Sequence, residues 1–213
     1  MLRKADIDLI QKDLAELDTV RDSVFETSRI SVRFSGRAIV ELHRGNFKKA
    51  AEHLANAEKA LRDLERMVKK REELKHQGNV TVAYQEYAEA KLLSNIMKKE
   101  KILSLGEVGA GMESYLLGLL DLVGELRRMC LNFLRAGKVS KAEHSLKMME
   151  EIYEDLYSLD HTAIIPNFRH KMDAVRKIIE TTRGDVVSDI RRLSLETALR
   201  SFEKRLLKKD PSH

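Results

Sequence analysis

The sequence predicts an all-α protein, and three features support this. Only 2 prolines and 10 glycines interrupt 213 residues, so long helices meet few breakers. Aromatic residues make up 5% of the chain and charged residues 34%, a composition rich in helix formers. Turn signals do not recur every ~8–12 residues, which excludes an all-β sandwich or barrel. We expect a single domain over residues 1–213, a bundle of about seven helices.

Apolar spacing places the first four helices. We expect them over residues 6–44, 47–76, 80–101 and 112–134, with glycine-asparagine breaks at Gly45 and Gly78. The glycine-rich stretch 106–111 is expected to be the most flexible internal loop. The helix over 112–134 is apolar on nearly every side, so we expect it at the centre of the bundle.

Three further helices complete the predicted fold. Ser140 and Glu143 have the spacing of a capping box, which predicts a fifth helix from there to residue 159. Pro166 suits the first turn of a sixth helix, which continues to about residue 192 with Gly184 as a weak point. A short seventh helix is expected over 194–207, followed by a frayed tail over 208–213.

Charge and cysteine content indicate the kind of partner and the cellular compartment of the protein. The chain has 39 basic and 34 acidic residues, and its net charge of +5 favours an anionic partner without identifying it. Cys130 is the single cysteine, so it cannot form an internal disulfide and fits a reducing compartment. The sequence has no membrane-spanning apolar run and no secretory signal pattern at its N-terminus. We expect a cytoplasmic protein with no membrane partner.

Four carboxylates occupy positions of the kind that apolar side chains normally fill. Glu86 and Glu89 fall in the seam formed by residues 82, 86, 89, 93 and 96 of the third predicted helix. Asp121 and Glu125 are the only charges between residues 115 and 126, and they share one face of the fourth helix. Burying unpaired carboxylates costs roughly several kcal/mol each, so a cation or a wet cavity must lie nearby.

Two interpretations of these acids remain open. Arg127, Arg128 or a lysine of another helix could neutralise them in an ion-pair network. Alternatively, four oxygen ligands without cysteine or histidine suit Mg²⁺ or Mn²⁺, which would allow metal-assisted phosphodiester hydrolysis. A ferritin-like di-iron site is excluded because it needs two Glu-x-x-His motifs, and only Glu73 with His76 forms a well-placed one.

A line of basic residues follows the first predicted helix. Arg29, Arg33 and Arg37 step by four residues, Arg44 lies near the same line, and His43 is beside it. The default interpretation is a solvated face paired with acids on a neighbouring helix, and the functional one is a stripe that follows a phosphate backbone. Similar helix starts at residues 45 and 137 lie 92 residues apart, which does not fit a tetratricopeptide repeat. A helical scaffold that binds only protein nevertheless stays an alternative.

Three segments of the chain resemble the translin superfamily, and within it the subunit type called translin-associated factor X (TRAX). Residues 115–130, YLLGLLDLVGELRRMC, resemble its YLLG…DL.GEL.RMC segment, and residues 85–90, QEYAEA, resemble QEYVEA. Its first-helix pattern SR…S.R…LHR is matched here by Ser28-Arg29, Ser35, Arg37 and Leu42-His43-Arg44. The similarity covers most of the chain and is weakest over residues 104–112 and at both ends.

The resemblance implies a seven-helix fold, a hollow octamer and an Mg²⁺-dependent endoribonuclease that cleaves single-stranded RNA inside the shell with metal-activated water. TRAX-type subunits carry the catalytic and metal-binding acids, which match Glu86, Glu89, Asp121 and Glu125. Arg29, Arg37, His43 and Arg44 carry over as candidate RNA contacts, and Arg33 joins them from the stripe. The long insertion and basic N-terminal extension of larger relatives are missing. We expect a homo-octamer without a required translin-type subunit, and the alternative is a non-catalytic single-stranded nucleic-acid-binding or scaffold protein.

Overall fold

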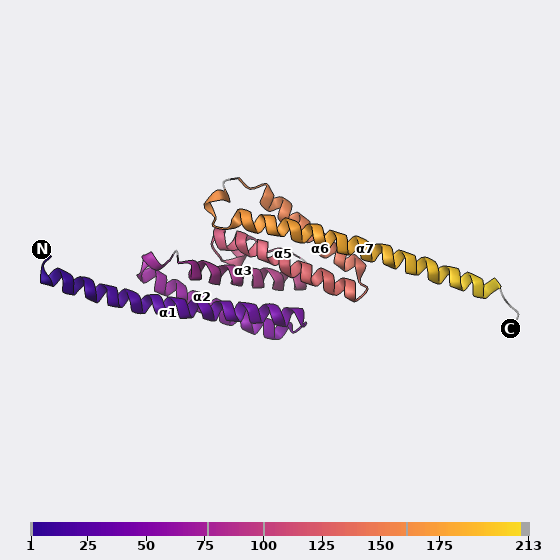
Figure 1. Cartoon of the computed structure of the whole chain (residues 1–213). Coiled ribbons are helices and arrows are strands. Elements are labelled where there is room, and N and C mark those ends of the chain that lie inside the picture. Colours follow the sequence, from indigo (N-terminus) through magenta and orange to yellow (C-terminus); the bar gives the residue numbers. More distant parts are fainter. Residues whose placement is uncertain (1, 76, 100, 161, 210–213) are drawn as a thin grey trace. The chain divides into compact units, whose positions relative to one another are not determined.

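The structure is a computed structural model that describes residues 2–75, 77–99, 101–160 and 162–209. These residues form α-helices joined by short turns, two 3₁₀ helices and no strand, which confirms the all-α prediction (Figure 1). The elements are α1 (Lys4–His43), α2 (Phe47–Lys70), η1 (Glu72–Leu74), α3 (Gly78–Lys99), α4 (Leu105–Val108), α5 (Met112–Arg135), α6 (Val139–Tyr157), η2 (Thr162–Ile164) and α7 (Phe168–Lys209).

The packing divides the chain into two compact units, residues 1–122 and residues 123–213. The boundary falls inside α5, so this helix contributes buried side chains to both units. The single domain expected over residues 1–213 stays a prediction.

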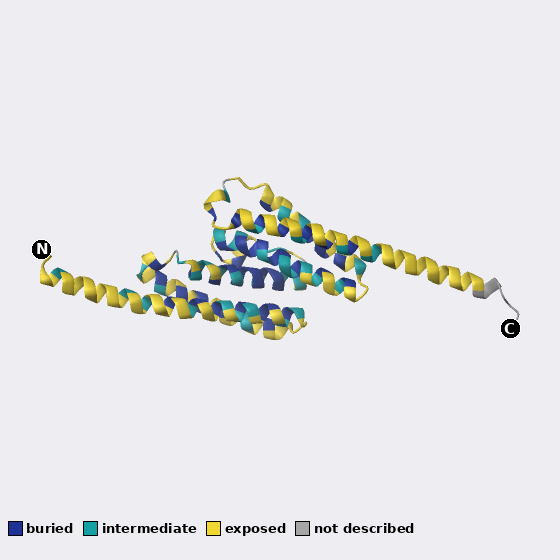
Figure 2. Cartoon of the chain, viewed as in Figure 1, coloured by how far each residue is buried: buried dark blue, intermediate teal, exposed yellow. Residues whose placement is uncertain are grey.

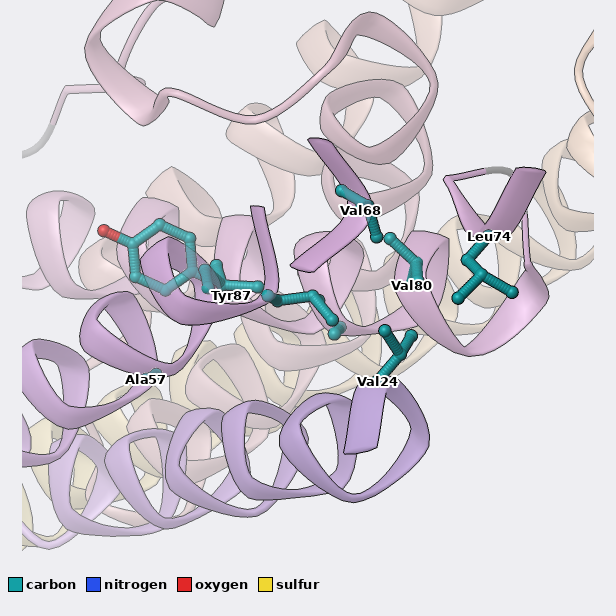
Figure 3. Packing of buried hydrophobic residues seen from close by; sticks show 9 residues of the cluster. Val24, Ala57, Val68, Leu74, Val80 and Tyr87 are labelled. Atoms are coloured by element: carbon teal, nitrogen blue, oxygen red, sulfur yellow. The ribbon is translucent and has the colours of Figure 1, made fainter. Parts of the chain in front are cut away.

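In the first unit, α1 and α2 form a hairpin, and α3 packs against both. Gly45 follows α1 with a φ of +77°, a left-handed conformation that glycine adopts without strain. A buried apolar cluster joins the three helices (Figure 3). It contains Val24 of α1, Ala57 and Val68 of α2, and Tyr87 of α3. This core holds α1 and α3 in fixed positions, and they carry most of the predicted site residues.

In the second unit, α6 packs against α7, and the end of α5 joins them through Arg127. The Arg127 guanidinium donates hydrogen bonds to the Ile178 carbonyl (3.2 Å) and the Thr182 hydroxyl (2.9 Å) of α7. Arg183 of α7 pairs with Glu150 of α6 at 2.6 Å. Arg127 is thus committed to α7.

The end of the second predicted helix differs from the expectation. α2 ends at Lys70, and Arg71 leaves the helical conformation with φ −140° and ψ 79°. Its guanidinium bonds Asp13 of α1 at 2.7 Å, which anchors the turn before η1. α3 begins at Gly78, which we had expected to lie in the break before it. His76, the predicted end of the second helix, lies outside the described residues.

The loop expected over residues 106–111 is shorter than predicted, because α4 (Leu105–Val108) includes its first three residues. Ser104 accepts a hydrogen bond from the Glu107 amide, and the Glu107 carboxylate accepts one from the Ser104 amide at 2.8 Å. This reciprocal capping box offsets the cost of starting a short helix. These hydrogen bonds lower the pKa of Glu107. Gly109, with a φ of +74°, ends the helix.

The capping box predicted at Ser140 and Glu143 was wrong. α6 begins at Val139, one residue earlier, and its N-cap Lys138 makes no side-chain cap. Ser140 therefore lies inside the first turn, where its hydroxyl is not at the capping position. The overall span of α6 agrees with the prediction to within two residues.

The two helices predicted after Pro166 form one helix, α7. It begins at Phe168, two residues beyond Pro166, so the proline lies in the preceding turn and not in the first helical turn. Gly184 is accommodated within the helix because a single glycine costs only about 1 kcal/mol relative to alanine. Of the predicted frayed tail, residues 208 and 209 are helical, and residues 210–213 lie outside the described part.

The first part of α1 and the last described part of α7 are mostly exposed (Figure 2), and large apolar residues are among those exposed. In α1 the exposed residues include Ile7, Leu9, Ile10 and Leu14 near its start. In α7 they include Leu195, Leu199, Phe202 and Leu206. Within the described ranges, none of the helices has an apolar stretch that could cross a membrane.

Candidate acidic site and arginine stripe

Close packing between α3 and the first half of α5 positions three of the four predicted acids. A Cβ added at Gly118 of α5 would lie 3.0 Å from the Ala88 Cβ and 3.0 Å from the Gln85 carbonyl oxygen of α3. Only a glycine allows the two backbones to approach this closely. The contact brings the stretch of α3 that carries Glu86 and Glu89 beside the stretch of α5 that ends at Asp121.

A side-chain hydrogen bond joins the same two helices. The Gln85 amide of α3 donates to the Asp121 carboxylate of α5 at 2.5 Å. Gln85 is buried, so its amide needs a partner, and Asp121 supplies one. This bond sets the position of one Asp121 oxygen relative to α3.

The acids differ in exposure. Glu89 is buried, with 8% of its surface exposed, whereas Glu86, Asp121 and Glu125 are half-buried. As expected from their spacing, these charged side chains occupy buried or half-buried positions on α3 and α5. Glu86 and Glu89 are one helical turn apart, as are Asp121 and Glu125.

The ion-pair interpretation holds in part for Glu125. The Arg128 guanidinium lies 3.7 Å from the Glu125 carboxylate, one turn along α5, and about half of the Arg128 side chain is exposed. Such an exposed pair contributes only about 0–1 kcal/mol. Arg127, the other arginine considered, makes its hydrogen bonds to α7.

The described residues contain no group of three or more His, Cys, Asp or Glu side chains placed to hold a metal ion. Glu86, Glu89 and Asp121, the three acids of the first unit, therefore do not form a ligand group among the described residues. Their donor chemistry still suits a hard divalent cation, because all the ligand atoms are carboxylate oxygens. Convergence on an ion requires rotation of these side chains about their χ angles.

The arginine stripe lies on the exposed side of α1. Arg29, Arg33, Arg37 and Arg44 are all exposed, and His43 beside them is half-buried. Arg29 is 3.5 Å from Glu26, and Arg44 is 3.0 Å from Glu41. Arg33 and Arg37 make no ion pair or hydrogen bond with the described residues. All four arginines are exposed, as the solvated-face interpretation expects, but the ion pairs of Arg29 and Arg44 are with residues of α1 one turn away and not with acids of a neighbouring helix.

The stripe adjoins the acid seam within the first unit. Arg29 and Arg33 of α1 line a depression of ≈ 490 Å³ together with Val82 of α3. Val82 lies one turn before Glu86 in the same seam. The structure therefore places part of the stripe beside Val82, the first residue of the seam, although the sequence has them on separate helices.

Two residues that line these surfaces were missed at the sequence level. Gln85 lies within the QEYAEA segment, but nothing in its spacing indicates a bond to Asp121. His53 of α2 lines a second depression with Arg33 and Arg37, and only the tertiary packing of α1 on α2 brings them together.

Comparisons with known proteins agree with this fold. The model of a family described as "Translin family" matches residues 9–182. An uncharacterized protein of Methanocaldococcus jannaschii is 32% identical over 195 residues, which cover 89% of this chain and 85% of that protein.

Solved structures are similar over most of the chain. A structure of AfC3PO in complex with duplex RNA has a TM-score of 0.78 and 26% identity, over 88% of this chain and 98% of that one. A crystal structure of AfC3PO has a TM-score of 0.78 and 28% identity, over 88% and 99%. Apo-NeC3PO, with a TM-score of 0.78 and 24% identity over 89% and 98%, is similar in fold.

Proposed function

The chain belongs to the translin family, and we propose that it is a TRAX-type subunit that binds RNA and cleaves it with a divalent metal ion. One observation carries the catalytic part. Carboxylates stand at all four positions that match the catalytic acids of that subunit type, on two helices packed as closely as Gly118 allows. Structural packing alone does not require charged residues there, because apolar side chains would fill the seam at lower cost.

The binding part of the proposal is supported by charge and by similarity. Arg33 and Arg37 present exposed guanidinium groups without carboxylate partners among the described residues, and the stripe adjoins the acid seam. Guanidinium groups suit phosphate because their planar donors bind it in pairs. The similar AfC3PO structure is a complex with duplex RNA. We propose single-stranded RNA as the cleaved substrate, so the experiments should compare single- and double-stranded oligonucleotides.

The donor set fits Mg²⁺, with Mn²⁺ as a substitute, and Glu86, Glu89, Asp121 and Glu125 would hold it. A bound ion would supply Lewis acidity and an activated water for attack on phosphorus. The residues of the chain provide the placement: Gln85 orients Asp121, and the arginines hold the flanking phosphates. Because attack by water needs no 2′-hydroxyl, we expect products with 5′-phosphate and 3′-hydroxyl ends.

Exposed apolar side chains support a homo-oligomer. Leu195, Leu199, Phe202 and Leu206 of α7 follow steps of four, three and four residues, which is the spacing of a helix-packing seam. A seam of this kind on one exposed helix favours burial against another copy of the chain. We propose a closed octamer, which light scattering would show as a mass near eight times 24.5 kDa. A stable monomer would contradict the enclosed-shell mechanism.

The second candidate is a non-catalytic single-stranded nucleic-acid-binding or scaffold protein. The absence of a preassembled metal cluster among the described acids favours it. A cleavage time course distinguishes the candidates: labelled RNA is incubated with the protein and Mg²⁺, Mn²⁺ or EDTA. We expect cleavage with either ion and none with EDTA. Intact RNA at micromolar protein with Mn²⁺ would favour the second candidate.

A further inference from the structure

The arginines of the first unit divide into two groups by their partners. Seven of its nine arginines lie within 4.0 Å of a carboxylate, as with Arg21 and Asp18 at 2.6 Å. Arg33 and Arg37 have no such partner among the described residues. They are one helical turn apart on α1, and both are exposed. Two adjacent unpaired cations repel each other, so an anion between them would relieve that repulsion.

These two arginines share a depression with a histidine of another helix. The depression has a volume of ≈ 530 Å³, and it is lined by Arg33 and Arg37 of α1, by Arg44 directly after that helix and by His53 of α2. Gly36 also lines it, and no atom lies within 4 Å of a Cβ added there, so its floor is open. The space is therefore large enough for a phosphate group, and its walls offer donors from two helices.

Phe34 holds two of these groups in place. The Arg37 guanidinium lies 5.8 Å from the centre of the Phe34 ring, and the His53 ring centre lies 5.9 Å from it. A cation over an aromatic face is attracted to it, which limits the rotamers of Arg37. The half-buried His53 imidazole has a buried Nδ1 without a hydrogen-bond partner in the described structure. The His53 ring therefore lines the depression with hydrogen-bonding capacity that the described residues do not use in full.

The Glu41 carboxylate that borders the depression already has its own partners. Glu41 accepts hydrogen bonds from Asn46 at 2.6 Å and from Arg44 at 3.0 Å. The bond from Asn46 lowers the pKa of Glu41, so it stays ionised at neutral pH and remains paired with Arg44. The charges of Arg33 and Arg37 are then left for a ligand.

We propose that Arg33, Arg37 and His53 form a discrete subsite for one phosphate group. The two guanidinium groups bind its oxygens, and the imidazole donates a further hydrogen bond. The identity of this phosphate as part of an RNA backbone rests on the proposed function. Binding of phosphate itself does not, because it depends only on the three side chains.

The first arm of the test uses inorganic phosphate. The unfolding midpoint is measured in phosphate and in chloride at equal ionic strength for the wild type, the double variant Arg33→Gln/Arg37→Gln and the single variant His53→Leu. A ligand that binds only the folded state raises the midpoint. We expect phosphate to raise the midpoint of the wild type, less so that of His53→Leu, and not that of the double variant. An equal rise in all three proteins would overturn the subsite.

The second arm uses a single-stranded RNA oligonucleotide and EDTA, with the affinity measured at several salt concentrations. The slope of log K against log [salt] is negative, and removing two phosphate contacts should make it shallower by about 0.7 per arginine. Arg21→Gln is the matched control, because Arg21 is on the same helix, is exposed and is paired with Asp18. We expect its slope to equal that of the wild type. Arg33→Lys/Arg37→Lys should keep the slope and lower the affinity, because lysine lacks the paired donors of arginine.

The two arms separate the proposals. A wild type that binds phosphate but no RNA would overturn the proposed function and leave the subsite intact. RNA binding with the same salt slope in the wild type and the double Gln variant would overturn the subsite as an RNA contact. Both arginines are exposed and unpaired in the described structure, so the double variant should fold with a stability within about 0.5 kcal/mol of the wild type.

Discussion

The acids of α3 and α5 and the arginines of α1 are both charged sets, but the fold treats them differently. Glu89 is buried, Asp121 is bonded to Gln85, and the two helices meet at Gly118 at the closest approach their backbones allow. Arg33 and Arg37 extend from the exposed side of one helix. Metal ligands must be placed to a few tenths of an ångström, whereas a long cationic side chain finds a phosphate over a wider range. This difference in placement is consistent with our proposal that the acids serve cleavage and the arginines serve RNA binding.

The largest expected effect comes from separating α3 and α5. In Gly118→Val, the new Cβ meets the Gln85 carbonyl oxygen at 3.0 Å, and a backbone atom cannot move aside cheaply. Overpacking should cost about 1–3 kcal/mol, and the shift should weaken the bond between Gln85 and Asp121. We expect a lower urea midpoint and loss of cleavage, with RNA affinity changed little.

Gly124→Ala is the control for that substitution. Gly124 lies on the same helix, and no atom lies within 4 Å of an added Cβ. Replacing a helical glycine by alanine then stabilises by about 0.5–1 kcal/mol. Equal urea midpoints for Gly118→Val and Gly124→Ala would show that the contact at Gly118 is not tight.

Asp121→Asn should remove cleavage and preserve the fold. The asparagine carbonyl can still accept the hydrogen bond from Gln85, and one negative charge leaves a surface that carries several. We expect the metal-free variant to melt no lower than the metal-free wild type, and Mg²⁺ to raise the wild-type midpoint more. If Asp121 is half of a buried ion pair, the substitution instead costs roughly 3–5 kcal/mol without dependence on Mg²⁺. That outcome would contradict the metal site.

Tyr87 tests the opposite side of α3, which faces the apolar core. Burial raises its pKa from 10.0 to about 12. The folded state favours the neutral phenol of Tyr87. Its burial therefore contributes fully to stability below pH 10, and this contribution is lost as the pH rises towards 12. The loss should reach at most about 2–3 kcal/mol, and Tyr87→Phe should lack this part of the alkaline decline. Tyr157 is 74% exposed, so Tyr157→Phe should follow the wild type.

The smallest expected effect on stability is that of Arg29→Ala. Arg29 and Glu26 are 3.5 Å apart and both mostly exposed, so loss of this pair should change stability by less than about 0.5 kcal/mol. If the side chain reaches RNA, affinity falls and its salt dependence becomes shallower. Unchanged affinity together with a slight loss of stability would assign Arg29 to the paired group and leave binding to Arg33 and Arg37.

Periodic features were predictable from the sequence, and contacts between elements were not. The seam that contains Glu86 and Glu89 and the face shared by Asp121 and Glu125 follow from helical spacing. In the structure Glu89 is buried and the other three acids are half-buried, whereas their role as a metal site stays a prediction. The bond from Gln85 to Asp121 and the approach of His53 to Arg37 depend on tertiary packing, which spacing does not specify.

Glycine, proline and capping-box patterns predicted the wrong helix boundaries at several places in the chain. Glycines over residues 106–111 suggested a loop, but the capping box at Ser104 and Glu107 is strong enough to form α4. The same four-residue spacing at Ser140 and Glu143 is not used, because α6 already begins at Val139. Pro166 lies before α7 and not in its first turn, and the break expected between residues 192 and 194 does not form, because α7 continues from Phe168 to Lys209.

The most direct test compares cleavage and binding in the same two variants. Cleavage of a single-stranded RNA in Mg²⁺ and its affinity in EDTA are measured for Asp121→Asn and for Arg33→Gln/Arg37→Gln. We predict that Asp121→Asn binds RNA as tightly as the wild type and does not cleave it. The arginine variant should bind more weakly and still cleave at saturating protein. Cleavage by Asp121→Asn at the wild-type rate would contradict the assignment of chemistry to the acid surface.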